Sequence, residues 1–307
     1  MRNKSEKMVG IFLATYNGEL YIREFLDSLI AQTFKDFCIY VRDDGSTDST
    51  LEIIAEYSLD LDICILDSEN RLGPAKGFFR IMEQASDSHL CYLFADQDDY
   101  WYDNKVARAV TELQGHQDEI MLYCSRLEYV DKNLEHLELS RIPKILNFEN
   151  ALVENIATGC TVAITRLMRS EILASKPYDF VMHDWWLYLY ATAFGRVIYD
   201  PIPSIKYRQH GGNVLGAATT FIEDFRRRFA RFRKKQGGIH SLSQQAKAFM
   251  ICYDEKLKIN HRKIIELLVL GTESFFIRLR LFVFPPVSRQ IPLDTFILRL
   301  LFLMGRY

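Results

Sequence analysis

The chain has 307 residues, of which 49% are hydrophobic and 25% are charged. This composition is ordinary for a globular protein and excludes a largely disordered or low-complexity chain. The net charge of −2 hides an uneven distribution: residues 1–219 contain 21 Lys and Arg against 33 Asp and Glu, whereas residues 220–307 contain 17 against 7. The acidic part suits carboxylate or metal chemistry, and the basic part suits an anionic surface, either lipid or nucleic acid.

Short apolar runs and helical patterns alternate through residues 1–125. Helical patterns cover residues 20–30, the segment after Gly73-Pro74, a segment through Tyr57 and a segment to about Gln114. The apolar runs predict buried strands at Val9–Ala14, Phe37–Arg42, Ile63–Leu66, Leu90–Ala95 and Ile120–Cys124. This alternation predicts an α/β fold with a doubly wound, mostly parallel sheet, which binds ligands at the carboxyl ends of its strands.

Two helix starts carry capping signals. Ser49 with Glu52 has the spacing of a capping box, and Asp103 can cap the helix that runs to about Gln114. Farther along, a helix is expected around Asp184–Phe194. From Phe221 onward the pattern is helical and basic, with a break at Pro285-Pro286. We therefore expect an α/β domain over residues 1–219 and a basic, amphipathic helical extension over residues 220–307.

The six cysteines contain no CxxC pair, which disfavours a zinc site or a disulfide framework and fits a reducing cytosol. The first residues, MRNKSEK, do not resemble a signal peptide. No stretch reaches the roughly 18 uncharged apolar residues of a membrane-spanning helix. The sequence thus predicts a cytoplasmic protein.

Carboxylates directly follow two of the predicted strands. The run Asp96–Asp99 places three carboxylates in four residues, which repel one another unless a cation joins them. A hard divalent cation bound to phosphate oxygens is the natural partner. Asp43 and Asp44 precede Gly45, an arrangement that alone is typical of an Asx turn, but a carboxylate there can also accept a hydrogen bond from a nucleobase or a ribose. We expect the two groups to share one site.

Several common nucleotide and hydrolase motifs are missing from the sequence. The turn after the first predicted strand, residues 14–18, is not GxGxxG, which disfavours a dinucleotide dehydrogenase. There is neither GxxxxGK[ST] nor GxSxG, so a P-loop NTPase and an α/β-hydrolase are disfavoured too.

Five polar motifs follow one another along the chain: Ala14-Thr15-Tyr16-Asn17, Asp43-Asp44-Gly45-Ser46, Asp96-Gln97-Asp98-Asp99, Thr158-Gly159-Cys160 and His183-Asp184-Trp185-Trp186. Taken in order, they resemble the motifs of family 2 glycosyltransferases with the GT-A fold. The later run Tyr207–Asn213 is similar to bacterial rhamnosyltransferase-like members that build surface polysaccharides. The resemblance covers roughly residues 8–216.

The resemblance implies a role for each matching residue. Asp184 would be the catalytic base, although it also suits a helix N-cap. Asp98 and His210 would bind Mn²⁺ or Mg²⁺, His210 being equally compatible with an ordinary surface or core histidine. Arg71 competes with Lys76 for the place beside the diphosphate. The residues implied to bind the nucleotide-sugar are Ala14, Tyr16, Asp43, Asp44, Lys76, Asp96, Gly159 and Arg208.

The function implied is a metal-dependent inverting glycosyltransferase of bacterial surface polysaccharide synthesis. Its donor would be a dTDP- or UDP-sugar carrying L-rhamnose or a hexose such as galactose, and its acceptor a lipid-linked glycan or an oligosaccharide. Two alternatives remain open: a sugar nucleotidyltransferase, or a non-enzymatic protein that binds nucleic acid through the basic tail. The acidic front would repel phosphate, so we expect no nucleic-acid partner.

The segment from Phe221 to Lys235 alternates aromatic and cationic residues. On a helix, four phenylalanines fall on one stripe beside Arg and Lys, as in an interfacial amphipathic helix. We therefore expect peripheral association with the anionic inner face of the cell membrane. The alternatives are packing on the catalytic domain and a homo-oligomer formed through Thr295–Met304. The four phenylalanines are Phe221, Phe225, Phe229 and Phe232.

Overall fold

The computed structural model describes residues 7–68, 70–209 and 241–307. The chain divides into two compact units. The catalytic-end unit comprises residues 1–142, 155–176 and 182–208, and the C-terminal unit comprises residues 143–154, 177–181 and 209–307. Each unit is described by itself.

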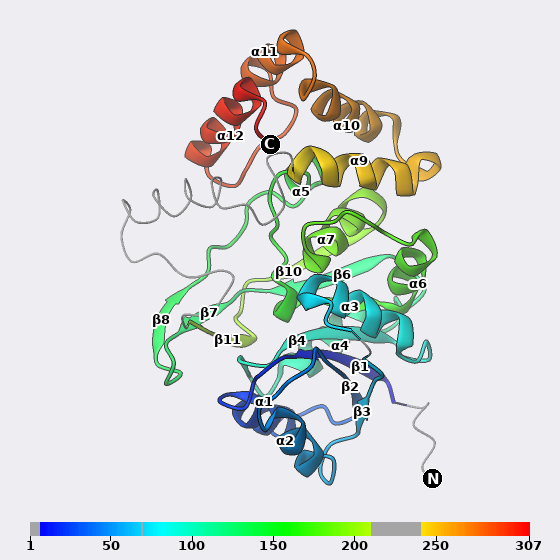
Figure 1. Ribbon diagram of the computed structural model, residues 1–307, viewed down its shortest axis with the longest axis vertical. Helices are drawn as coiled ribbons and strands as arrows, with labels where there is room; N and C mark the ends of the chain where they lie inside the picture. Colours follow the sequence, from blue (N-terminus) through cyan, green and yellow to red (C-terminus); the bar gives the residue numbers. More distant parts are fainter. Residues whose placement is uncertain (1–6, 69, 210–240) are drawn as a thin grey trace. The chain divides into compact units, whose positions relative to one another are not determined.

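A seven-stranded sheet forms the centre of the catalytic-end unit (Figure 1). All neighbouring strands are parallel except β9, which runs antiparallel to β4 and β6. The mostly parallel sheet predicted from the sequence is confirmed. In spatial order the strands are β10 (Arg196–Asp200), β6 (Met121–Ser125), β9 (Ala163–Thr165), β4 (Cys91–Asp96), β1 (Val9–Thr15), β2 (Phe37–Asp43) and β3 (Ile63–Ile65).

Helices cover both faces of this sheet, as Figure 1 shows for the labelled elements. On one face, Ile11 and Leu13 of β1 join a core formed with α1 (Ile22–Ile30), α2 (Thr50–Tyr57) and α4 (Lys105–Leu113). On the other face, Phe12 meets Phe94, which packs against α3 and α7. The helices of this second face are α3 (Gly73–Gln84), α6 (Arg166–Ser175) and α7 (His183–Phe194). The fold is therefore doubly wound, because alternate residues of each strand face opposite helical layers.

The predicted strands agree with the structure to within one residue at either end. Of the two predicted caps, Ser49 has the N-cap position but not the predicted hydrogen bond, and Asp103 is wrong. The Ser49 side chain makes no capping hydrogen bond; instead, the carboxylate of Asp48 accepts a hydrogen bond from the Thr50 N–H at 3.1 Å. Helix α4 follows Asn104 as its N-cap. Asp103 lies one residue too early, and its carbonyl oxygen accepts a hydrogen bond from the Thr33 N–H at 2.7 Å.

A second, four-stranded sheet lies beside the acidic turn. Its order is β5 (Tyr100–Trp101), β11 (Ile205–Arg208), β7 (Glu128–Val130) and β8 (His136–Leu139). Strand β5 begins directly after the carboxylates that follow β4 and pairs antiparallel with β11. The second sheet therefore anchors the far side of the acidic turn.

The C-terminal unit is helical in its described part, as expected. Its helices are α5 (Phe148–Ala151), α9 (Ser241–Tyr253), α10 (Ile259–Gly271), α11 (Phe275–Val283) and α12 (Pro292–Met304), with the 3₁₀ turn η3 (Asp254–Lys256). Helix α11 ends at Val283, before the predicted break at Pro285-Pro286. No helix in the described ranges combines the length and apolar character needed to cross a membrane. The helix expected over residues 221–235 lies outside the described residues.

Candidate functional site

Three strands end together at one edge of the large sheet. Thr15 at the end of β1 pairs with Asp43 at the end of β2, and Ala14 pairs with Asp96 at the end of β4. The parallel register thus brings the first-strand turn and both acidic groups to the same edge. The 3₁₀ turn η2 (Gly159–Thr161) packs on β4 and on α7, which adds Gly159 and Asp184 to this region.

Asp43 is a structural part of this edge. Its buried carboxylate accepts hydrogen bonds from the Thr15 hydroxyl at 2.8 Å and from the backbone N–H groups of Gly45 and Ser46 at 3.0 and 2.7 Å. The Ser46 hydroxyl donates a fourth at 2.6 Å. Four donors on two carboxylate oxygens hold the β2 turn against the end of β1.

Asp44 connects this turn to the start of α3. Its carboxylate accepts hydrogen bonds from the backbone N–H groups of Leu72 at 2.9 Å and Gly73 at 2.7 Å, and it pairs with the Arg42 guanidinium. Burial alone would raise its pKa, but these donors outweigh burial and the pKa is lowered. Asp44 is therefore an ionised carboxylate whose position is set by the loop before α3.

Tyr16 lies next, exposed at the end of β1. Its backbone N–H donates to the side-chain oxygen of Gln97 at 3.0 Å, and the Gln97 amide donates back to the Tyr16 carbonyl at 2.9 Å. The Arg71 guanidinium lies 3.8 Å from the centre of the Tyr16 ring. Of the two cations considered from the sequence, Arg71 makes this contact, whereas Lys76 is exposed in the first half of α3.

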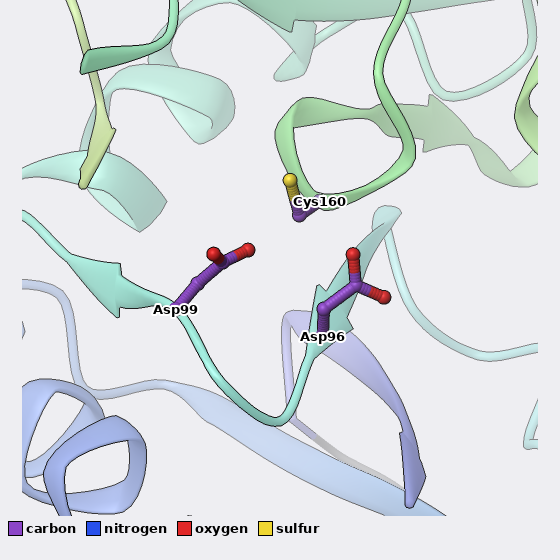
Figure 2. A group of neighbouring side chains, drawn as sticks. All are labelled: Asp96, Asp99 and Cys160. Atoms are coloured by element: carbon purple, nitrogen blue, oxygen red, sulfur yellow. The ribbon is translucent and has the colours of Figure 1, made fainter. Parts of the chain in front are cut away.

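The acidic turn after β4 holds carboxylates close together (Figure 2). Ligand atoms of Asp96, Asp99 and Cys160 all lie within 4.8 Å of one another. Burial, followed by the charges of Asp98 and Asp184, raises the pKa of Asp96 to about 7. Burial and the neighbouring carboxylates also raise the pKa of Asp99 well above its usual range. The negative charge of this turn is thus costly without a proton or a cation.

The donor set fits a hard divalent cation. Asp96 and Asp99 supply the carboxylate oxygens that Mg²⁺ and Mn²⁺ prefer, and a bound cation would relieve their mutual repulsion. Asp98, the ligand expected from the sequence, does not belong to this group, although its charge raises the pKa of both neighbours. Burial raises the pKa of the Cys160 thiol well above its usual range, so this cysteine stays protonated and is a poor ligand. His210, the other ligand expected from the sequence, lies outside the described residues.

Asp184 lies in the first turn of α7, where the helix dipole favours a negative charge. Its buried carboxylate accepts hydrogen bonds from the Gly159 N–H at 2.9 Å and the Trp185 N–H at 2.7 Å. Burial raises its pKa to about 6, and the hydrogen bonds, including one from the Asn155 side chain, only partly oppose that rise. A carboxylate with this pKa can take up a proton near neutral pH.

His183 is a neighbour whose importance the sequence analysis missed. Its ring packs between Phe78 and Phe94, with centroid distances of 4.2 and 5.5 Å. Burial lowers its pKa to about 3, so the imidazole is neutral. A Cβ atom at Gly159 would lie 2.9 Å from His183 Nε2. The ring therefore allows only glycine to bring its N–H to Asp184 without a rearrangement.

Arg208 is fully buried at the end of β11 and acts on the acidic turn from within the protein. Its Nε donates to the Asp98 carbonyl oxygen at 2.9 Å, and its backbone N–H donates to the Asp99 carboxylate at 3.2 Å. Its guanidinium also pairs with Glu24 and lies 4.5 Å from the Tyr21 ring centre. Arg208 thus holds the turn in place. Glu24 and Tyr21, which contact Arg208, belong to no sequence motif and could not be predicted as part of this region.

The chain was then compared with known proteins. The family model described as Glycosyl transferase family 2 matches residues 11–175, more than half of the chain. The chain belongs to this family. The family 2 match ends before Asp184 and therefore covers the strand-end motifs but not the whole candidate site. Family membership favours a sugar transferase over the nucleotidyltransferase and nucleic-acid-binding alternatives.

Two characterised relatives show how this family 2 chain relates to named enzymes. The dTDP-rhamnosyl transferase RfbG of Shigella flexneri is 34% identical over 233 residues, which cover 70% of this chain and 77% of that protein. The poly(ribitol-phosphate) beta-N-acetylglucosaminyltransferase TarS of Staphylococcus aureus is 35% identical over 116 residues, 37% of this chain and 20% of TarS.

Solved structures of other glycosyltransferases share the fold. S. aureus TarS 1–349 in complex with UDP-GlcNAc has a TM-score of 0.56 and 18% identity, and the match covers 88% of this chain and 83% of that one. GalNAc-T7 with UDP, GalNAc and Mn²⁺ has a TM-score of 0.58 and 12% identity, covering 88% and 52%. The GT-A fold expected from the sequence is confirmed.

Proposed function

We propose that this family 2 chain is a metal-dependent inverting glycosyltransferase that uses a dTDP- or UDP-sugar. The main observation behind the proposal is the paired arrangement at the sheet edge. The repelling carboxylates of the turn after β4 suit a divalent cation, and the buried Asp184, with a pKa of about 6, suits a general base. Inversion in one displacement needs one such base on the acceptor hydroxyl.

The strand-end residues are assigned to the nucleotide half of the donor. Ala14 and Tyr16 line the base, and Asp44 is the carboxylate that reads it, with Asp43 holding the turn. Asp96 faces the ribose. Either Lys76 or Arg71 approaches the diphosphate; the contact of Arg71 with Tyr16 at 3.8 Å supports Arg71.

The remaining site residues are assigned to the diphosphate of the donor and to the acceptor hydroxyl. Asp98 and His210 are proposed to hold Mn²⁺ or Mg²⁺, which stabilises the charge of a leaving diphosphate when bound. Asp184 accepts the proton of the acceptor hydroxyl. Gly159 orients Asp184 through its N–H, and Arg208 keeps the acidic turn in place.

The names of the relatives support the choice of donor. The name of the Shigella flexneri relative supports dTDP-L-rhamnose as donor. UDP-sugars, including UDP-galactose, are the alternative donors, because the structural neighbour TarS was solved with UDP-GlcNAc. The proposed acceptor is a lipid-linked glycan or an oligosaccharide of bacterial surface polysaccharide synthesis.

The proposed organisation and location keep the boundaries expected from the sequence. Residues 1–219 form the catalytic domain, and residues 220–307 place the enzyme at the cytoplasmic face of the cell membrane, where a lipid-linked acceptor lies. Self-association through the extension is the proposed alternative role of its apolar helices.

Thermal-shift measurements on the full chain test the donor and the metal together. UDP, dTDP and GDP are each added with and without Mn²⁺. We expect UDP or dTDP to raise the melting temperature by mass action, and more strongly with the metal. The preferred nucleotide then selects the sugar donors for a transfer assay in which the anomeric configuration of the product is determined. Retention of configuration, or binding of no nucleotide, would contradict the proposal.

A further inference from the structure

A pocket of about 430 Å³ lies within the C-terminal unit, between the segment that precedes α5 and the start of α12. Its wall is partly apolar, with Ile145, Pro292 and Phe296, and partly cationic, with Arg289 and Arg299. None of the described residues that line it is acidic. The pocket therefore suits an anion attached to an apolar group.

The pocket has a fixed wall. Gln290, one of its lining residues, accepts hydrogen bonds from the backbone N–H groups of Lys144 at 2.8 Å and Ile145 at 3.2 Å. Its side-chain amide donates to the Ile145 carbonyl at 2.6 Å, and its own backbone N–H donates to the Glu154 carboxylate at 2.7 Å. These bonds join two segments far apart in the sequence, so the site is largely preformed.

Arg299 is one of the two arginines that line this pocket. Within the described ranges its side chain makes no ion pair, and its Nε is buried without a hydrogen-bond partner. Arg289 lines the same pocket. The start of α12 adds the positive end of its helix dipole, although the buried Asp294 in that first turn partly offsets it. A guanidinium in such a place fits the oxygens of a phosphate group.

Exposed apolar stripes run along the two helices beside the pocket. On α12, the exposed residues Leu293, Phe296, Leu300 and Met304 recur at helical spacing. On α11, which packs against α12, the side chain of Phe276 is 82% exposed and begins a similar stripe with Leu279 and Val283. Because Phe296 belongs to both the stripe and the pocket wall, the cationic and apolar surfaces are continuous.

We infer that this pocket and the stripes of α11 and α12 bind an anionic phospholipid at a membrane surface. Arg289 and Arg299 hold the phosphate of the headgroup, and Phe276 and Phe296 contact the acyl chains. Residues 241–307 carry 10 Lys and Arg against 5 Asp and Glu, which complements an anionic leaflet. The inference rests on the proposed location at the membrane but not on the transfer chemistry.

Vesicle flotation of the full chain tests the site, with vesicles of phosphatidylcholine alone and of an equimolar mixture with phosphatidylglycerol. We expect the wild type to bind the mixed vesicles. Arg289→Gln and Arg299→Gln should each weaken binding about five-fold, the equivalent of about 1 kcal/mol. Lys263→Gln is the matched control, because it removes one exposed charge from α10, outside the pocket, and it should have little effect.

Other outcomes would overturn the inference. Failure of the wild type to bind mixed vesicles would remove both the site and the membrane location. An equal loss in the Lys263→Gln control would assign binding to general charge. If glycerol 3-phosphate raises the melting temperature while vesicles do not bind, the ligand is a soluble phosphate. If the wild type is a dimer by light scattering that Phe296→Ser converts to a monomer, a second copy covers the stripes.

Two further measurements keep these results interpretable. Melting temperatures of all variants show whether they fold. Nucleotide binding, followed by the thermal shift with UDP or dTDP, should be unchanged in Arg289→Gln and Arg299→Gln. Loss of vesicle binding with nucleotide binding retained thus separates the lipid site from the proposed transfer function.

Discussion

The two units of this protein depart in opposite ways from the usual burial of apolar side chains and exposure of charged ones. At the sheet edge of the catalytic-end unit, carboxylates are buried: Asp99 and Asp184 have raised pKa values and Asp43 is enclosed by donors. In the C-terminal unit, large apolar side chains such as Phe276 and Phe284 are exposed by 82% and 76%. Both arrangements cost free energy in an isolated chain.

The contrast predicts a ligand in each place. A bound cation would reduce the repulsion between buried carboxylates. A membrane with anionic headgroups would cover exposed aromatic side chains and pair with the arginines beside them. We therefore expect substitutions in these two places to change transfer or ligand binding, whereas substitutions in the sheet core should change stability alone. Substitutions that change one of these properties and not the other test this comparison.

The largest effect is expected for Asp184→Asn. An amide cannot take the acceptor proton, so transfer should fall by about 10²–10⁴-fold. The variant should remain folded, because the asparagine side-chain oxygen can still accept a hydrogen bond from the Gly159 N–H. Transfer rates and thermal unfolding are measured on the same preparation. Full activity in a folded Asp184→Asn protein would remove the base assignment.

Substitution of the glycine beside Asp184 should disturb both packing and activity. In Gly159→Ala the new Cβ would lie 2.9 Å from His183 Nε2, so overpacking should lower the free energy of unfolding by about 1–3 kcal/mol. Denaturant unfolding measures this change. In the matched control, Gly77→Ala, the Cβ would meet its nearest neighbour at 3.5 Å. Because Gly77 lies inside α3, that change should be neutral or stabilising. Equal losses in the two variants would contradict the close-contact explanation.

The pH profile of transfer should have an ascending limb near the Asp184 pKa of about 6. The rate rises as the carboxyl group loses its proton and becomes able to accept one. Asn155→Ala removes a hydrogen bond that lowers this pKa, so the limb should move to higher pH. An unchanged limb would show that another group controls the rate.

The raised pKa of Asp184 also makes the free energy of unfolding depend on pH. Between the ordinary pKa of 3.8 and the folded value of about 6, the folded protein holds a proton that the unfolded chain releases. The contribution of Asp184 to the free energy of unfolding is therefore present at low pH and is lost as the pH rises through about 6. Unfolding of the wild type and Asp184→Asn at pH 4 and pH 7 measures it, and the wild type should lose more stability than the variant between these values.

The smallest effect on stability is expected at the exposed stripe. Phe276→Ser should change the free energy of unfolding by no more than about 0.5 kcal/mol, whereas Phe12→Ala in the sheet core should cost about 3–5 kcal/mol. Phe276→Ser should nevertheless weaken vesicle binding. A large loss of stability in Phe276→Ser would mean that this side chain packs within the protein.

Much of the fold was predictable because its signals are local. The five strands of residues 1–125 are continuous apolar runs, and Pro74 marks the start of α3, where the structure has it. The two caps were harder to predict because several polar residues stand near each helix start. Ser49 keeps the N-cap position of α2, but Asp48 rather than Ser49 accepts the hydrogen bond from the Thr50 N–H, and Asn104 rather than Asp103 is the N-cap of α4.

The candidate site divides in the same manner. Asp96 and Asp44 were identifiable from their place directly after strands, and Asp184 from its motif. His183 stands in the motif of Asp184, but nothing in the sequence showed that its neutral ring restricts Gly159. Glu24, which pairs with Arg208, carries no motif. Arg208 itself was expected to bind the nucleotide-sugar, but its described partners lie within the protein and tie it to the acidic turn.

The sequence by itself determined the strand–helix alternation, the polar residues at the strand ends, the family and the charge difference between the two parts of the chain. These properties depend on residue type and on spacing along the chain. Only the tertiary structure decided which carboxylates lie within 4.8 Å of each other, which arginines line the pocket beside α12, and which apolar residues stay exposed. Those properties depend on distances between segments far apart in the sequence, and the free energy of burial is set by that three-dimensional neighbourhood.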